Sequence, residues 1–170
     1  MSIQQNVKNL KKQVAPFEQS QTMKSIWQLI NTLVPFFLLW YLTYLSLSVS
    51  IWLMLIPAIL AAGFMTRTFI IFHDCTHHSF FKNRKWNRAI GTFTGVLTLF
   101  PYDQWGYEHS VHHATSGNLD KRGVGDIWTL TVDEYIAAPL KTRVAYRLYR
   151  SPFVMFILGP IYVFLLKNRF

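Results

Sequence analysis

Two short clusters hold all six histidines of the 170-residue chain. One is the segment HDCTHH, and the other is HSVHH. Histidines that are three or four residues apart share one face of a helix, so several imidazoles of a cluster can converge on one ion. Imidazole binds iron, zinc, copper and nickel well. The spacing therefore predicts a metal site with ligands among His73, His77, His78, His109, His112 and His113.

The donor types favour two metal ions or one iron of higher coordination number. Structural zinc sites are usually tetrahedral and contain cysteine, whereas this chain has one cysteine, Cys75. Five or six imidazoles exceed the needs of one tetrahedral zinc. Haem is an alternative, but haem held between membrane helices needs isolated histidines inside the spans. The single cysteine also excludes an internal disulfide and suits a reducing compartment.

The elements that carry these clusters are predicted to be membrane helices. Apolar residues make up 51% of the chain and charged residues only 15%, and residues 25–66 include no charged side chain. As a helix these residues would reach about 63 Å, roughly twice the thickness of a hydrocarbon core. We therefore expect an all-α, multi-pass transmembrane protein. Its spans are expected near residues 30–45 and 51–69, with a serine-rich turn at 46–50, and near residues 151–166.

The net charge of +9 agrees with this topology. Basic residues precede the first span and surround both clusters, whereas the serine-rich turn has none. The positive-inside rule then places the clusters on the cytoplasmic side, and the plasma membrane is the expected location. A nucleic-acid partner is not expected, because no groove-reading helix accompanies the basic residues. One basic run could hold anionic lipid head groups, steer an acidic electron carrier, or only set the topology: Lys82, Arg84, Lys85 and Arg88.

The chain divides into an arm and a membrane domain. Residues 1–24 are expected to be a cytoplasmic arm, either a helix on the membrane surface or a disordered tail. Residues 25–170 are expected to form the membrane domain. Within it, residues 89–102 are uncharged but too short to cross a bilayer comfortably, which favours a re-entrant or interfacial segment.

The clusters also resemble those of a known family. HDCTHHSFF resembles the first histidine box of the membrane fatty-acid desaturases, and HSVHH resembles their second box. The surrounding sequence PYDQWGYEHSVHHATSGNLDKRGVGDIWTLTVDEY is similar to bacterial acyl-lipid desaturases, most of all to the Δ5 type of bacilli. The resemblance covers essentially the whole chain.

This resemblance implies a non-haem di-iron centre on a four-helix membrane core, with ligands from three histidine boxes. The centre would use O₂ to introduce a cis double bond into acyl chains of membrane phospholipids. Electrons would come from ferredoxin, flavodoxin or a similar carrier. No catalytic side chain is implied beyond the metal ligands. The implied ligands are His73, His77, His109, His112 and His113, while His78 departs from the pattern as a spare or alternative ligand.

Acidic residues near the boxes are candidate acceptors for imidazole N–H groups, or else solvated loop residues. They are Asp74, Asp103, Glu108, Asp120 and Asp126.

The third box that the resemblance implies is absent from these 170 residues. We therefore expect an incomplete four-helix core, namely the N-terminal half of a desaturase. Two alternatives remain. One is another histidine-box oxygenase, such as a hydroxylase, an alkane mono-oxygenase or a carotenoid ketolase. The other is a truncated membrane protein that binds metal without catalysis.

Overall fold

The computed structural model describes residues 3–17, 19–123 and 125–167, and every regular element in this part of the chain is helical. The helices form two compact units, one that ends at Thr98 and one that begins at Leu99. Two of the helices are long and apolar enough to cross a membrane. The expected all-α, multi-pass transmembrane class is thereby confirmed.

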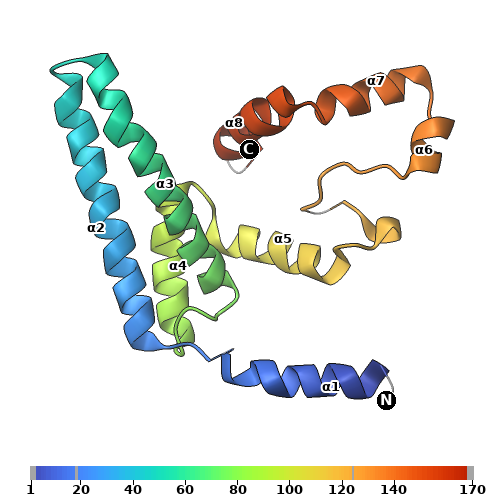
Figure 1. The fold of residues 1–170 in the computed structure, drawn as a ribbon, viewed down its shortest axis with the longest axis horizontal. Coiled ribbons are helices and arrows are strands. Elements are labelled where there is room, and N and C mark those ends of the chain that lie inside the picture. The colour runs from blue at the N-terminus through green and yellow to red at the C-terminus, as the bar shows by residue number, and fades with distance from the viewer. Residues whose placement is uncertain (1–2, 18, 124, 168–170) are drawn as a thin grey trace. The chain divides into compact units, whose positions relative to one another are not determined.

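The first unit is a helical hairpin with one further helix beside it. Its elements are α1 (Ile3–Val14), the short 3₁₀ turn η1 (Ala15–Phe17), α2 (Thr22–Leu47), α3 (Ile51–Thr76) and α4 (Arg84–Thr98). Helices α2 and α3 run antiparallel, and α4 lies alongside α3 (Figure 1). The helix α1 shows that residues 3–14 of the predicted arm are helical rather than disordered.

The two long helices contain the two predicted early spans. Each has 26 residues and is therefore about 39 Å long, which exceeds a hydrocarbon core of about 30 Å. The turn between them is confined to residues 48–50, and the Ser50 hydroxyl accepts a hydrogen bond from the Trp52 N–H at 3.2 Å. This N-cap satisfies one of the free N–H groups at the start of α3. The excess length leaves the final turns of α3 beyond the apolar stretch.

The second unit consists of shorter helices. They are α5 (Tyr102–Thr115), η2 (Leu119–Lys121), α6 (Val132–Ala137), α7 (Leu140–Tyr149), the π-helical η3 (Val154–Leu158), α8 (Gly159–Tyr162) and the π-helical η4 (Val163–Lys167). Helix α7 and the stretch Val154–Lys167 meet at a bend of 57°. Together they are long and apolar enough to form one broken span or a re-entrant loop. The predicted third span at 151–166 therefore corresponds to the second arm of this bent pair.

Small and polar residues pack the first unit. The α4 residues that are buried include two glycines and two threonines, and such residues let helix backbones approach closely. Arg67 on α3 donates a hydrogen bond to the Asn31 side chain on α2 at 2.7 Å. Ser25, at the start of α2, donates to the carbonyl of Phe80 just beyond α3. The buried residues of α4 are Asn87, Gly91, Thr94, Gly95 and Thr98.

Asn87 holds the connection between α3 and α4. Its side chain is fully buried, and it accepts a hydrogen bond from the Phe81 N–H at 2.9 Å and donates one to the Phe81 carbonyl at 2.6 Å. Phe80 and Phe81 are themselves buried, with ring centroids 4.9 Å apart. The amide thus satisfies two main-chain groups that would otherwise be buried without partners.

We predict that Asn87→Leu destabilises the protein by about 2–4 kcal/mol, because it leaves both main-chain groups of Phe81 unsatisfied. The measurement is the thermal unfolding midpoint of the purified chain in detergent, followed by circular dichroism. Arg84→Gln on the exposed part of the same helix is the control and should leave the midpoint unchanged. Equal midpoints for Asn87→Leu and the wild type would contradict this role.

Candidate metal centre

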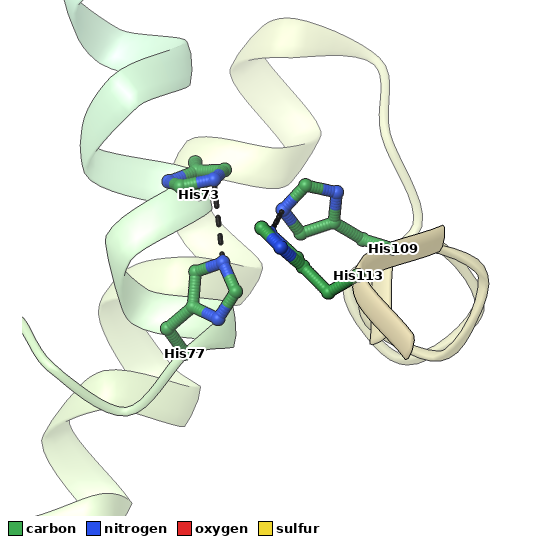
Figure 2. A group of neighbouring side chains, drawn as sticks. All are labelled: His73, His77, His109 and His113. Carbon is green, nitrogen blue, oxygen red and sulfur yellow. Dashed lines mark hydrogen bonds between the residues drawn. The ribbon is translucent and has the colours of Figure 1, made fainter. Parts of the chain in front are cut away.

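The last turn of α3 brings two histidines of the first cluster together. His73 and His77 lie one helical turn apart, and their Nε2 atoms are 3.3 Å from each other (Figure 2). The other ring nitrogen of His73, Nδ1, is 3.0 Å from a carboxylate oxygen of Asp74. Since a carboxylate can only accept, Nδ1 carries the proton of a neutral His73 ring, and Nε2 keeps its lone pair.

The third histidine of this cluster ends the helix. His77 is the C-cap, and His78 follows with φ 56°. The His78 N–H donates to the Cys75 carbonyl at 3.0 Å, and the Ser79 N–H donates to the Asp74 carbonyl at 3.1 Å. These two bonds define a Schellman motif, in which the residue at the His78 position takes the left-handed conformation. His78 therefore has a structural role here, and its assignment as a ligand stays a prediction.

The second cluster lies on α5. The Nε2 atoms of His109 and His113 are 3.0 Å apart, again across one helical turn (Figure 2). The indole of Trp105 stacks on the His109 ring with a centroid separation of 4.3 Å and an interplanar angle of 22°. Stacking restricts the rotation of the His109 ring, which keeps its Nε2 atom turned toward His113.

His112 is held by a carboxylate from the following loop. Its Nδ1 atom lies 2.8 Å from Oδ1 of Asp126. The other oxygen of Asp126 accepts a hydrogen bond from the Gly123 N–H at 3.3 Å. Gly125 has φ 77°, and a Cβ atom at this position would lie 2.9 Å from the His112 Cβ. A glycine is thus required for the loop to approach the histidine this closely.

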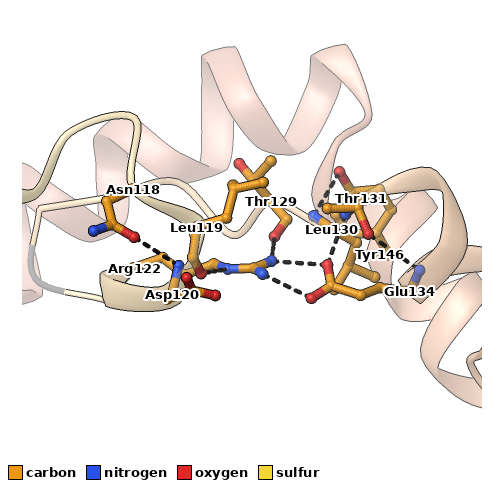
Figure 3. A network of polar contacts seen from close by, with 9 residues as sticks. All are labelled: Asn118, Leu119, Asp120, Arg122, Thr129, Leu130, Thr131, Glu134 and Tyr146. Carbon is orange, nitrogen blue, oxygen red and sulfur yellow. Dashed lines mark hydrogen bonds and ion pairs between the residues drawn. The ribbon is translucent and has the colours of Figure 1, made fainter.

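An ion pair closes the same loop. The Arg122 guanidinium forms a two-bond contact with the Glu134 carboxylate, at 2.7 and 2.9 Å (Figure 3). It also donates to the carbonyls of Leu119 and Thr129. Glu134 accepts from the Thr131 N–H at 2.7 Å, and its own N–H donates to the Thr131 hydroxyl, which completes a capping box at the start of α6. Residues 119 and 134 are therefore tied together across the segment that carries Asp126.

Within each unit, the histidine pair fits a metal. Two imidazoles bound to one ion at about 2.1 Å place their nitrogens about 3.0–3.4 Å apart for octahedral or tetrahedral angles. The Nε2 separations in both pairs fall in this range. Hydrogen bonds from Nδ1 to carboxylates, seen at His73 and His112, are typical of metal-binding histidines.

Comparison with known proteins identifies the family of the chain. The family model described as fatty acid desaturase matches residues 50–170, a range that includes both histidine clusters. This chain belongs to the fatty acid desaturase family. No solved structure shows a significant match to it.

Several curated desaturases resemble this one. The fatty acid desaturase of Bacillus subtilis (strain 168) is 65% identical over 163 residues, which cover 96% of this chain and 46% of the relative. The sn-1 oleoyl-lipid 12-desaturase of Synechocystis is 32% identical over 89 residues, which cover 52% of this chain and 25% of the relative. The sn-1 acyl-lipid omega-3 desaturase (ferredoxin) of Nostoc is 33% identical over 97 residues, which cover 56% of this chain and 25% of the relative. The desaturase chain thus spans less than half the length of these relatives.

The structure separates the acidic candidates of this desaturase. Asp74 and Asp126 contact imidazoles, whereas the Glu108 carboxylate contacts Gln104 and Lys167. Sequence reasoning missed the roles of Arg122 and Gly125. The T-x-x-E pattern of residues 131–134 was the available signal for the capping box. The sequence contains no comparable signal for the ion pair between Arg122 and Glu134.

Arg122, in the first place, and then the Thr131 N–H lower the pKa of the Glu134 carboxyl to about 2 from an ordinary value of 4.5. The ionised Glu134 carboxylate therefore stabilises the folded chain. Because its pKa is lower in the folded state, this contribution to stability is complete above about pH 4.5 and is lost as the pH falls through about 2.

We predict that Arg122→Gln raises the pKa of Glu134 toward 4.5, although the Thr131 bond keeps part of the depression. Carbon-13 NMR titration of the Glu134 carboxyl in detergent micelles measures this change. Lys141→Gln removes the same charge elsewhere in this unit and should leave the titration unaltered. An unchanged pKa in Arg122→Gln would show that the ion pair does not form in solution.

Proposed function

We propose that the histidines of both clusters are ligands of a non-haem di-iron centre in an acyl-lipid desaturase. The observation that carries the proposal is the pairing of imidazoles. In a chain of the desaturase family, the Nε2 atoms of His73 and His77 and those of His109 and His113 lie 3.3 and 3.0 Å apart. These separations suit ligands of one ion better than solvated surface histidines, which would not face each other.

Iron is proposed because the reaction needs a redox-active metal. An acyl –CH₂–CH₂– segment, O₂, two electrons and two protons give a cis –CH=CH– segment and two molecules of water. Zinc has no redox chemistry, whereas iron bound to these residues would supply the oxidation of an unactivated methylene by O₂. The protein's own part is to position the ligands and to exclude water.

The chain's own residues orient the imidazoles. Asp74 and Asp126 each accept a hydrogen bond from an Nδ1–H group, which would leave Nε2 of His73 and of His112 available to a metal ion. The closed loop between Arg122 and Glu134 holds Asp126 in place. The proposed ligand set consists of the other five histidines, with His78, which occupies the helix-ending position, as a spare or alternative ligand.

The proposed substrate is an acyl chain of a membrane phospholipid, with Δ5 as the proposed position of the double bond. Two relatives are named for acyl-lipid substrates, and one of these names includes ferredoxin. An electron donor such as ferredoxin or flavodoxin is accordingly proposed here. The two apolar helices and the surrounding basic residues support a plasma-membrane location with the clusters on the cytoplasmic side.

Iron content tests the ligand assignment. The chain is expressed in a bacterial membrane, purified in detergent, loaded with Fe(II) without oxygen and desalted. We expect His77→Ala and His113→Ala to lose most of the bound iron. We expect His78→Gly to retain it, because glycine suits the left-handed position. Equal iron in all variants would contradict the assignment.

The fatty acids of the same host test the reaction. New cis-unsaturated chains that disappear in His77→Ala would support desaturation, and hydroxylated chains would instead assign a hydroxylase. Bound iron with an unchanged lipid profile would show that these residues hold metal without sufficing for activity.

Asp126→Asn should lower the metal affinity about 10- to 100-fold, because the carboxylate no longer orients His112. Titration with Co(II), followed by visible absorbance, measures the affinity without any need for turnover. Asp120→Asn removes the same charge from the same loop and is the control. An affinity that falls equally in both variants would indicate a general charge effect rather than orientation of His112.

A further inference from the structure

Helix α7 presents three arginines that the histidine clusters do not use. Arg143, Arg147 and the C-cap residue Arg150 follow one another at spacings of four and three, so they share a face of the helix. The helix contains no acidic residue. Among the residues that the structure describes, no ion pair joins these three side chains to a carboxylate. This face therefore has positive charge available for an anionic ligand.

A cavity of about 510 Å³ lies beside this face. Two guanidinium groups, those of Arg147 and Arg150, form its charged part, and the remainder is largely apolar and aromatic. Residues from the loop before α6 and from α6 complete it, among them Leu130, Val132, Tyr135 and, from α7, Tyr146. A cavity of this kind suits a ligand that has both an anionic group and an apolar body.

Two buried polar atoms, one on the cavity residue Tyr135 and one on Arg143 of α7, have no partner among the described residues. The hydroxyl of Tyr135 is buried and forms no hydrogen bond within the described chain, and the same holds for Nε of Arg143. A buried polar group without a partner is costly, so such groups call for a ligand or another explanation. The guanidinium of Arg147 lies over the Tyr135 ring, with its Cζ atom 5.7 Å from the ring centroid. Tyr135 and Arg147 thus contact each other and both line the cavity.

The position along the chain indicates a membrane ligand. Arg150 lies four residues before Val154, in the break where α7 and the stretch Val154–Lys167 meet at 57° in the pair that can pass as a span. Tyr146 and Tyr149 precede it, and tyrosines are enriched where a chain enters the headgroup region. Basic residues at this depth meet lipid phosphates.

We infer that this cavity binds the phosphate of a membrane phospholipid through Arg147, Arg150 and the Tyr135 hydroxyl. Phosphate oxygens accept hydrogen bonds, and the fork of a guanidinium donates two in parallel. The apolar wall of the cavity would contact the glycerol and the first carbons of the acyl chains. An acidic electron-carrier protein fits less well, because its carboxylates would not use the apolar wall.

The site has a consequence for the proposed reaction, and this step alone rests on the proposed function. Arg150 also lines a second cavity, of about 470 Å³, whose wall includes His112 and Asp126. A phospholipid held at Arg150 is therefore anchored beside a proposed iron ligand. Its phosphate would fix how far along the acyl chain the double bond is introduced.

Tyr135→Phe gives the sharpest test. The variant removes only a hydroxyl that has no partner in the described part of the chain, so the unfolding midpoint of the lipid-free chain should stay the same or rise. We expect its affinity for dioleoylphosphatidylglycerol, measured by native mass spectrometry of the metal-free chain in a neutral detergent, to fall about five- to tenfold. Arg150→Gln should lower this affinity at least about tenfold. Lys141→Gln, which removes a charge from the same helix outside the cavity, should match the wild type.

Two further ligands distinguish the source of the phosphate. Dioleoylglycerol, with the same acyl chains and no phosphate, should bind far more weakly, and inorganic phosphate should not displace the lipid at equal concentration. Equal binding of dioleoylglycerol, or equal lipid binding by wild type, Tyr135→Phe and Arg150→Gln, would overturn the inference. Displacement by inorganic phosphate would assign the site to the free anion. Because the chain is free of metal in this experiment, its outcome is independent of the iron and desaturation tests.

Discussion

The geometry of the first histidine pair depends on helical hydrogen bonding that continues past the apolar part of α3. Within the bilayer, the lack of water forces the backbone into a helix, but His73 and His77 come after the last apolar residues of the predicted span. The helix continues through Thr76, and His77 keeps a right-handed conformation as its C-cap. Because the helix closes only at His78, the two Nε2 atoms still face each other across a full turn. Termination one turn earlier would separate them.

The polar contacts around this helix end fix its place in the first unit. The Ser25 hydroxyl and the Asn87 amide bind the main chain of Phe80 and Phe81, directly after the histidine turn. The starts of α2 and α4 therefore hold the segment that follows α3. These contacts are short-range and directional, whereas the packing of apolar helices against each other in lipid has little directional preference. We consider them the reason that the segment after the turn with His73 and His77 is held against α2 and α4.

The second unit positions its histidines by a different principle. On α5 the helix sets the pair of His109 and His113, but the orientation of His112 depends on Asp126, fourteen residues later in the chain. That carboxylate reaches the imidazole because Gly125 permits a close approach and because Arg122 and Glu134 close the loop. The loop thus supplies a negative charge next to His112 through Asp126 and a close backbone approach through Gly125. Arg122 of this loop and Arg150 at the end of α7 line the same cavity as His112.

The sequence by itself determined the two long membrane helices and the family of the chain. The uncharged run at 25–66, measured against a bilayer, predicts the α2–α3 hairpin, and the spacing of the histidines predicts which of them share a helical face. Both inferences rest on periodic, local constraints that are visible in a linear string. The relatives show that the family resemblance was correct, while the ligand roles of the histidines remain a proposal.

Only the tertiary structure decided which neighbours act on those histidines. Five acidic residues lay near the clusters in sequence, and the structure shows that the carboxylates of Asp74 and Asp126 contact an imidazole. The backbone role of His78, which ends α3 in a left-handed conformation, also appears only in the structure, and its role as a ligand stays a prediction. The reason is physical: a hydrogen bond between residues such as His112 and Asp126 depends on the path of the loop between them. That path is set by left-handed glycines and by a distant ion pair, and the linear spacing of residues does not record it.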